Sequence, residues 1–269
     1  MIKRDYYLNR LIDYKDKDII KIITGVKNSG KSYLLFNVYY DYLLSVGIKA
    51  ENIIRIKLES IRYKNLRESE KLFQYLDNLI NKHERYYIFI DEIQLLDQFE
   101  DVVNGIKIDF NCDLYITGSN SKLLSSEINT KLRGRGIEIK VFPLSFKEFY
   151  DGTSDKNIAF NEYIKYGGLP YINSLDKEYE KTEYLKMLNE TVATKDIIER
   201  NKIRNEGVFN ALLDLLCSSI GSYVSPNKIA NTLNSNGFKT VNSETINNYL
   251  KYLTDAFLFY KPKLPKKLY

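Results

Sequence analysis

The segment GVKNSGKS at 25–32 combines residue types and a spacing that can hold phosphate groups. Its glycines let the backbone curl so that several N–H groups face one point, and the positive end of a following helix adds attraction for an anion. In this pattern Lys31 would reach the β- and γ-phosphates of a nucleotide, and the Ser32 hydroxyl would ligate Mg²⁺. We therefore predict an ATP-binding loop of Gly25, Val26, Lys27, Asn28, Ser29, Gly30, Lys31, Ser32 and Tyr33.

A second segment, YYIFIDEIQ at 86–94, is an apolar run that ends in two carboxylates. The carboxyl ends of parallel strands meet at the sheet edge where a phosphate-binding loop also lies. We therefore predict that Asp91 holds the Mg²⁺ of the nucleotide together with Ser32. Glu92, one residue further on, is predicted to polarise the water that attacks the γ-phosphate. The two segments together predict ATP hydrolysis.

Two weaker segments could complete such a site. ITGSNS at 116–121 would lie beside the phosphate loop, where Ser119 or Asn120 could contact the γ-phosphate or orient the water; a plain polar loop cap is the alternative. LRGRG at 132–136 makes Arg135 a candidate arginine finger that acts in a neighbouring subunit of a homo-oligomer. An exposed basic turn is the alternative for Arg135.

The composition excludes several other chemistries. His83 is the only histidine, which excludes Ser–His and Cys–His catalysis and argues against a zinc site. Cys112 and Cys217 are far apart and lie in no CxxC pattern, as expected of ordinary thiols in a reducing compartment. The sequence has no run of about 18 apolar residues, and its first residues lack the apolar stretch of a signal peptide. We expect a cytoplasmic protein without a membrane partner.

Apolar runs alternate with amphipathic stretches in the first half of the sequence. Five of these runs are predicted to be strands, at 19–25, 53–58, 86–91, 113–117 and 137–141. Continuous apolar runs are typical of strands buried on both faces of a parallel sheet. The segments between them include apolar residues at helical spacing, such as Leu35, Tyr39 and Leu43. This alternation predicts an α/β fold with a doubly wound parallel sheet, as in the P-loop NTPases.

Only helices are predicted after Pro143. The Gly-Gly-Leu-Pro sequence at 167–170 is predicted to end a helix over 157–166. Two short helices with a tight link, which begin near Ser225 and Ser243, resemble a winged helix-turn-helix. We predict three domains: an ATP-binding core over 1–144, a helical lid over 145–205 and a winged-helix-like domain over 206–269.

The charge is uneven along the chain. From Arg200 onward there are ten Lys and Arg against four Asp and Glu, a balance of +6, whereas residues 1–199 carry 30 basic against 31 acidic residues, a balance of −1. A basic end behind a neutral body is typical of proteins that bind nucleic acid. A solvated Lys-rich tail explains the charge equally well, so DNA stays open as a partner.

The motifs GVKNSGKS, YYIFIDEIQ, ITGSNS, LRGRG, PLSFKEFY and YGGLP occur in the order found in AAA+ ATPases of the STAND-like group of bacteria and archaea. The chain resembles that family from Arg4 to about Tyr260. Members usually carry a C-terminal domain of unknown function. The resemblance implies an ATPase core of the AAA+/ASCE type, a helical lid, a winged helix and an ATP-controlled switch. It also implies that Gly168 and Pro170 lie against the adenine of ATP.

The sequence departs from the family pattern in two respects. Lys27 and Asn28 stand where the family usually has arginine, and Ile137 stands where it often has an acidic residue. Family members also generally continue into a restriction-endonuclease-like domain with D…ExK residues, whereas this sequence stops at Lys-Lys-Leu-Tyr. We therefore expect no nuclease activity from these 269 residues.

Three functions remain open on the sequence. The first is an ATPase that uses Mg²⁺ and couples hydrolysis to a conformational change, with DNA as a candidate partner on which that change takes place. The second is a slow ATP-dependent switch, in which bound nucleotide locks one state and turnover is incidental. The third is a DNA-binding regulator that acts through the helix-turn-helix alone.

Overall fold

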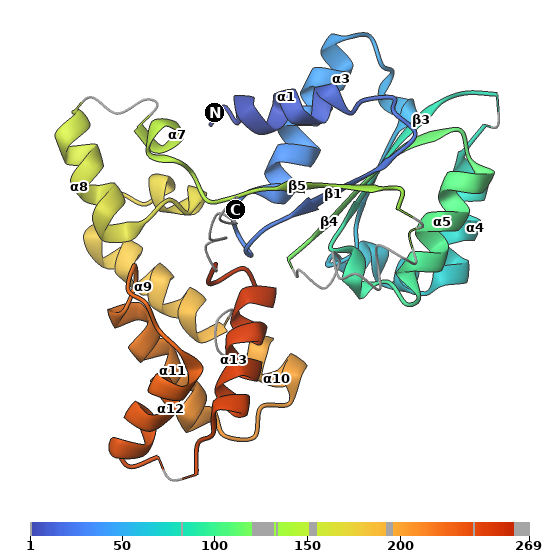
Figure 1. Cartoon of the computed structure of the whole chain (residues 1–269). Helices are drawn as coiled ribbons and strands as arrows, with labels where there is room; N and C mark the ends of the chain where they lie inside the picture. Colours follow the sequence, from blue (N-terminus) through green and yellow to red (C-terminus); the bar gives the residue numbers. More distant parts are fainter. Residues whose placement is uncertain are drawn as a thin grey trace, which may run out of the picture. The chain divides into compact units, whose positions relative to one another are not determined.

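The computed structural model describes residues 2–81, 83–119, 132, 134–150, 155–191, 196–238 and 240–260. The chain divides into two compact units, Met1–Asp176 and Lys177–Tyr269 (Figure 1). The first unit is built on a sheet, and the described part of the second is helical. The division into three domains at residues 144 and 205 stays a prediction.

A five-stranded parallel sheet forms the centre of the first unit. Its strands are β1 (Ile20–Thr24), β2 (Ile53–Lys57), β3 (Tyr86–Asp91), β4 (Cys112–Gly118) and β5 (Gly136–Lys140). They lie in the order β2-β3-β4-β1-β5, so all five predicted strands are confirmed. In β1, Ile22 lies opposite Ile116 of β4 and Glu138 of β5. The segments that follow β1, β3 and β4 therefore leave the sheet at the same edge.

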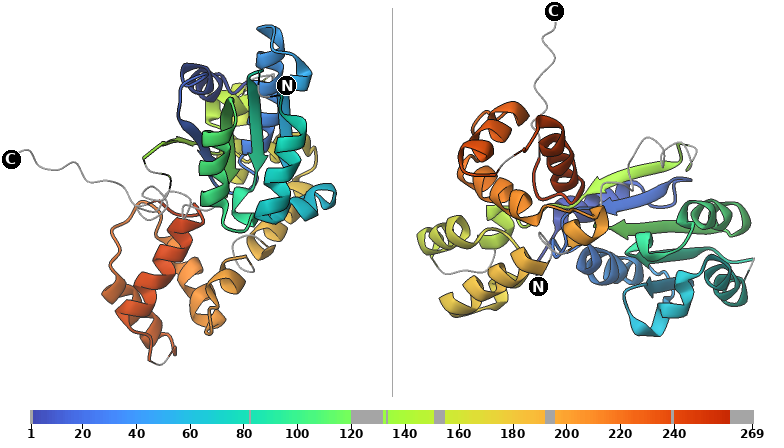
Figure 2. Two further views of the ribbon diagram at one scale, coloured as in Figure 1. Left: turned by 90° about the vertical axis from the view of Figure 1, so that its right-hand side faces the viewer. Right: turned by 90° about the horizontal axis from the view of Figure 1, so that it is seen from below.

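Helices cover both faces of this sheet (Figure 2). On one face lie α4 (Ser69–Leu79) and α5 (Phe99–Asp109), whose Leu76 and Ile106 are buried in the same cluster as Ile22 of β1. The sheet side chains that point the other way, such as Phe89 of β3, belong to a second buried cluster. The sheet thus has a dry core on each side, as the continuous apolar runs predict.

The second cluster joins the sheet to α1 (Asp5–Asp13) and to the helix that follows β1. That helix is continuous through α2 (Lys31–Tyr33), a π-helical stretch at Leu34–Tyr39 and α3 (Tyr40–Ser45). Its fully buried side chains include Leu34, Leu35, Tyr39 and Leu43, and α1 contributes the fully buried Leu11 and the almost fully buried Tyr7. The start of the helix is therefore held firmly against the sheet.

After β5 the first unit continues as α7 (Phe146–Tyr150), α8 (Lys156–Tyr166) and a 3₁₀ turn at Pro170–Ser174. Gly167 has a φ of 76° and ends α8, which confirms the predicted stop. The N–H of Leu144 donates to the carbonyl oxygen of Gly168 at 2.6 Å. A Cβ at Gly168 would lie 2.2 Å from the Leu144 carbonyl oxygen, so this close approach requires glycine.

The described helices of the second unit are α9 (Glu178–Leu188), α10 (Asp196–Asn201), α11 (Glu206–Ser218), α12 (Pro226–Ser235) and α13 (Ser243–Asp255). They share one core that includes Phe209 of α11, Leu233 of α12 and Ile246 of α13. Ser225 caps α12 and Asn242 caps α13 through side-chain oxygens. Residues 177–260, so far as they are described, include no strand, and the wing of the predicted winged helix stays a prediction.

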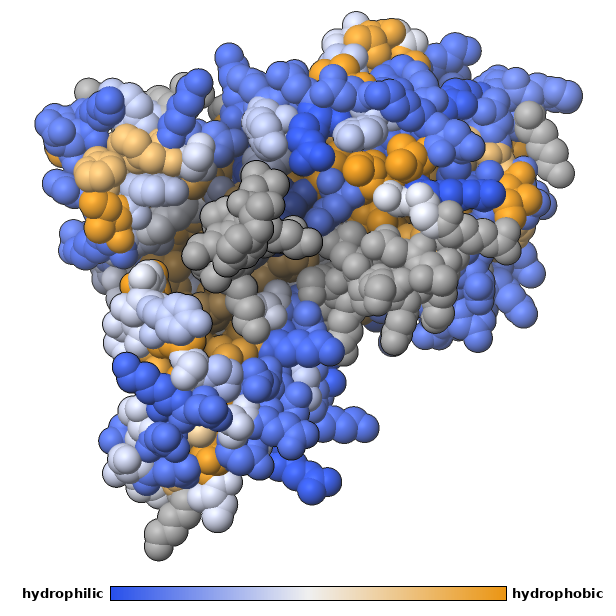
Figure 3. All heavy atoms as spheres, viewed as in Figure 1, coloured by the Kyte–Doolittle hydropathy of each residue, from blue (hydrophilic) through white to orange (hydrophobic). Residues whose placement is uncertain are grey.

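In the parts of the chain that the structure describes, no helix is both long and apolar enough to span a membrane. The face drawn in Figure 3 is mainly hydrophilic, with apolar side chains in separate patches. In α8 the apolar side chains of Ile158 and Ile164 are exposed.

Candidate active site

The loop between β1 and α2 curls as its glycines predict. Gly25 has a φ of 148° and Gly30 a φ of 93°, values that favour glycine. A Cβ at Gly25 would lie 2.0 Å from the carbonyl oxygen of Val141, so a larger residue would displace the loop from the end of β5. Gly30 is the N-cap of α2, and no side chain caps the first turn. The first N–H groups of the helix are therefore available to an anion.

Lys31 lies inside this curl rather than in solvent. Its side-chain amine donates to the carbonyl oxygens of Gly25 and Val26, at 3.0 Å each, and the residue is 4% exposed. Burial lowers the pKa of Lys31, and the carboxylates of Glu92 and Asp91 act in the opposite direction. The amine thus lies between the phosphate loop and the acidic end of β3.

Asp91 connects the phosphate loop to the strands. Its Oδ1 accepts hydrogen bonds from the Ser32 hydroxyl at 2.9 Å and from the Thr117 hydroxyl at 2.5 Å. Burial raises the pKa of Asp91, and these two hydrogen bonds lower it in part. Ser32 and Asp91 thus place a hydroxyl and a carboxylate oxygen together at the helix N-terminus. These are the oxygen ligands that Mg²⁺ accepts beside nucleotide phosphates, so the residues present fit Mg-ATP.

Glu92 has a strained backbone, with φ 54° and ψ 54° in the left-handed region. Its N–H donates to the Thr117 hydroxyl oxygen at 3.0 Å, so Thr117 holds both acidic residues. Its Oε2 accepts hydrogen bonds from the Gln94 side-chain amide and from the Ser119 hydroxyl, the latter at 3.2 Å. The left-handed turn and the two hydrogen-bond donors fix the Glu92 carboxylate beside Asp91, just past the end of β3.

Comparisons with known proteins find matches along most of this chain. The family model described as "AAA domain" matches residues 17–150, and one described as "Domain of unknown function (DUF8612)" matches residues 157–264. An uncharacterized protein of Haemophilus influenzae is 40% identical over 98% of this chain and 67% of its own length. This chain belongs to the AAA-type P-loop ATPases.

Two further proteins are similar to this chain. This AAA ATPase is 34% identical to an uncharacterized protein of Methanocaldococcus jannaschii, over 96% of the chain and 60% of that relative. The chain thus spans about two thirds or less of these relatives. It is also similar to the structure of a Walker-type ATPase of Pyrococcus abyssi, with a TM-score of 0.65 at 16% identity, over 95% of this chain and 90% of that one. At that identity the likeness shows the fold alone.

The other candidate residues of this AAA ATPase fall in different places. Ser119 joins the site through Glu92, and Pro170 approaches the loop, because a Cβ at Gly30 would lie 3.5 Å from the Pro170 ring. Asn120 lies outside the described residues. Arg135 is exposed next to the amino end of β1, where its carbonyl oxygen accepts from Ile20 at 2.7 Å. It therefore lies at the opposite edge of the sheet from its own phosphate loop, and a role in a neighbouring subunit stays a prediction.

Three residues of this site are absent from the sequence-based candidates. Thr117 bridges Asp91 and Glu92, Gln94 binds the Glu92 carboxylate, and Arg4 contacts the phosphate loop from α1. The position of Gln94 in the motif YYIFIDEIQ was a signal for it. Thr117 also had a signal, because it ends the predicted strand at 113–117 as Asp91 ends that at 86–91, and the carboxyl ends of parallel strands meet at one edge.

We expect Thr117→Val to destabilise the first unit by about 1–3 kcal/mol, because it leaves the buried Glu92 N–H without its acceptor and Asp91 without one donor. Urea denaturation followed by circular dichroism measures this loss. Thr232→Val is the matched control, since its hydroxyl donates to Lys228 on an exposed face of α12. Equal stability of the two variants would contradict the bridging role of Thr117.

Proposed function

We propose that this chain binds Mg-ATP in the loop at 25–32 and hydrolyses it with Glu92 as the general base. The observation that carries the proposal is the hydrogen bond of 2.9 Å between Ser32 and Asp91. It joins a phosphate loop to an acidic strand end 59 positions away in the sequence, with Lys31 and Glu92 beside the contact. A structural turn would not require a buried lysine and two carboxylates at one helix N-terminus.

Each residue has a defined task in this proposal. The N–H groups at the start of α2 and the Lys31 amine bind the β- and γ-phosphates. Ser32 Oγ and Asp91 Oδ1 would hold Mg²⁺, which neutralises phosphate charge and orients the γ-phosphate when it is bound. Glu92 Oε2 orients the attacking water and takes its proton, and Ser119 holds that oxygen in place. The chain contributes positions and charge, which is most of what phosphoryl transfer requires.

Phosphate release from ATP by the purified chain tests this function, with a malachite-green assay in Mg²⁺ with and without duplex DNA. Lys31→Ala is expected to weaken Mg-ATP binding by about 10- to 100-fold, because it removes a charged donor to the phosphates. Lys49→Ala is the control, because the Lys49 side chain is 70% exposed and lies in no phosphate loop. Calorimetry measures the affinity. No heat from correctly folded wild type with Mg-ATP would refute the proposal.

A slow ATP-dependent switch is the second candidate, and the Glu92 geometry favours it. Gln94 and Ser119 both hydrogen-bond to the carboxylate oxygen that would accept the proton of water. Two donors on that oxygen compete with the attacking water for it, so turnover is slow until they move away. Nucleotide that stays bound through purification, together with turnover near zero, would support the switch over the fast enzyme.

We also propose DNA as a partner of the helix pair and a homo-oligomer of this chain. α12 and α13 form a capped helix pair, and α13 exposes Asn247, Asn248 and Lys251 on one face, which suits contacts to a groove and to phosphates. Titration of duplex DNA at two salt concentrations tests this, because phosphate contacts weaken as salt rises. Light scattering with and without ATP tests a homo-oligomer, in which Arg135 would act on the nucleotide of a neighbouring subunit.

A further inference from the structure

Arg4 is a charged residue that the structure buries behind the phosphate loop, with 1% of its surface exposed. Its guanidinium lies 4.6 Å from the centre of the Tyr7 ring, and its Nε lies 2.9 Å from a carboxylate oxygen of Glu148 in α7. A buried charge is expensive unless it is paired and hydrogen-bonded. Arg4 is thus retained in the interior beside a carboxylate and is hydrogen-bonded through its two terminal nitrogens, whereas its Nε makes no hydrogen bond within the described part of the chain.

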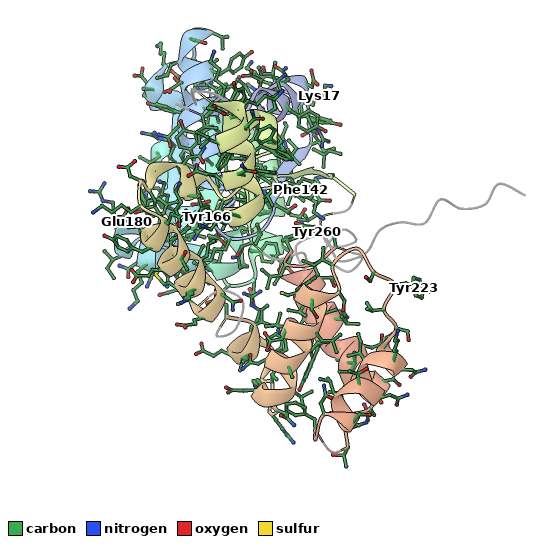
Figure 4. All side chains as sticks on the ribbon, turned by 90° about the vertical axis from the view of Figure 1, so that its left-hand side faces the viewer. Lys17, Phe142, Tyr166, Glu180, Tyr223 and Tyr260 are labelled. Atoms are coloured by element: carbon green, nitrogen blue, oxygen red, sulfur yellow. The ribbon has the colours of Figure 1, made fainter. Side chains whose placement is uncertain are left out.

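Its two terminal nitrogens bind backbone oxygens of two different segments. Nη1 donates to the carbonyl oxygen of Ser29, inside the phosphate loop, at 3.0 Å. Nη2 donates to the carbonyl oxygen of Phe142, directly after β5, at 2.7 Å (Phe142 is labelled in Figure 4). The planar fork of arginine binds the two carbonyls through two separate nitrogens held in a fixed geometry, which the single nitrogen of lysine does not reproduce.

The bond to Ser29 decides the direction of the peptide that follows it. In a planar trans peptide the C=O of one residue and the N–H of the next point in opposite directions. Because the Ser29 oxygen points inward to Arg4, the N–H of Gly30 points outward, to the side where the phosphates would bind. A flipped peptide would instead present an oxygen to the phosphates. Gly30, with φ 93°, is flexible enough to permit that flip unless something holds the carbonyl.

We propose that Arg4 is a positioning residue that holds the Ser29–Gly30 peptide in its phosphate-binding orientation. This inference rests on the proposed binding of ATP by the loop. Arg4 acts through the backbone of Ser29 and does not touch the nucleotide. The expected consequence of its loss is a loop that is still folded but donates one hydrogen bond less to the phosphates.

The surroundings of Arg4 make it a fixed support. Its own carbonyl oxygen accepts the N–H groups of Tyr7 and Leu8 at 2.9 Å each, at the start of α1. The Tyr7 hydroxyl oxygen accepts the N–H of Phe142 at 3.1 Å. The Glu148 carboxylate is itself oriented by the N–H and hydroxyl of Ser145, both at 2.8 Å. The guanidinium therefore connects α1, the phosphate loop and α7. A shift of any of these segments would change the direction in which the Gly30 N–H points.

Arg4→Met and Arg4→Lys test the proposal, with calorimetric titration of Mg-ATP and of Mg-pyrophosphate well below the thermal midpoint of each variant. Arg4→Met should weaken both ligands by about tenfold or more, as the loss of one hydrogen bond to a charged group predicts. Arg4→Lys, which keeps the charge and the packing of the stem, should weaken both by about three- to tenfold and carries the test where Arg4→Met does not fold. Pyrophosphate is included because it probes the phosphate contacts without adenine.

The control is the double variant Lys21→Met/Asp113→Asn, which removes another buried ion pair of the same unit, at the amino ends of β1 and β4. It should lower the thermal midpoint and leave both affinities within about twofold of wild type. Arg4→Lys with lowered stability but unchanged affinities would overturn the proposal and leave Arg4 a purely structural residue. If wild type binds neither ligand, the proposed function itself fails. If wild type binds both ligands and Lys31→Ala weakens that binding, the proposed function holds, and unchanged affinities of Arg4→Lys then count against the role of Arg4 alone.

Discussion

Glu92→Gln is expected to lower the ATPase rate by about 100- to 10,000-fold, the range that a positioned general base contributes. Affinity for Mg-ATP should stay within about threefold of wild type, because in the proposed function Glu92 orients water and is not a ligand of the phosphates. Glutamine keeps the size of the side chain and an oxygen for Gln94 and Ser119, so the turn after β3 should persist. Single-turnover phosphate release and calorimetric titration together measure both quantities.

Glu70→Gln is the matched control for this variant, because Glu70 is an exposed residue of α4. If wild type turns over fast and Glu92→Gln stays within about threefold of that rate, another group takes the proton. The same comparison separates the two proposed functions. In the fast enzyme the variant should show a large drop in rate, whereas in the slow switch wild type itself should turn over near the rate of the variant.

Much of the fold was predictable, because the parallel sheet leaves a strong record in the sequence. Strands such as β3 and β4 are buried along their whole length, so their residues are apolar on both faces and stand out as runs. The phosphate loop was equally clear, because its glycines and Lys31 must keep one spacing to surround an anion. The prediction of Ser32 beside Asp91 follows from the strand order, in which both segments leave the sheet at one edge.

The helices α1 and α5 were not predicted, although their buried residues have helical spacing. Tyr7 and Leu11 of α1 are separated by four positions, but charged residues surround them. In α5, Val102 and Ile106 have the same spacing, but Gly105 lies between them and lowers the helical propensity of the segment. Their helices are stabilised by packing on the sheet, and local helix propensity carries no information about that packing.

Arg4 shows a second limit of prediction. It is 25 positions away from Ser29 and 138 from Phe142, so no local spacing points to either contact. Its role depends on how α1 packs against the helix after the phosphate loop, and that packing is decided by shape. The residues of the phosphate loop are recognisable as a motif, whereas the residue proposed to hold the loop in place is recognisable only in three dimensions.

A polar cluster at the amino ends of the same strands stands apart from the candidate site. Lys21 of β1 forms an ion pair with Asp113 of β4, and both side chains are fully buried. The second oxygen of Asp113 accepts from the Tyr115 hydroxyl at 2.7 Å and from the Asp16 N–H at 2.8 Å. The Lys21 amine also donates to the Lys17 carbonyl oxygen at 2.8 Å. Burial lowers the pKa of Lys21, and Asp113 acts in the opposite direction.

Lys21→Met is therefore expected to destabilise the chain by about 3–5 kcal/mol, because methionine fills the space of the stem but leaves the Asp113 carboxylate buried without its cation. Such a loss is a large fraction of the stability of a typical domain. Urea denaturation at neutral pH measures it as a lower midpoint at an unchanged slope. The penalty is electrostatic, so it should depend on the charge that remains and not on the methionine.

The double variant Lys21→Met/Asp113→Asn separates these two causes. Asparagine removes the uncompensated charge and keeps an oxygen that Tyr115 and the Asp16 N–H can use, so at least half of the lost stability should return. If the double variant is as unstable as Lys21→Met, the loss comes from packing around the stem and not from the charge. Because the pair lies at the opposite edge of the sheet from Lys31 and Asp91, the recovery should be the same with and without Mg-ATP, apart from the general stabilisation that any bound ligand adds.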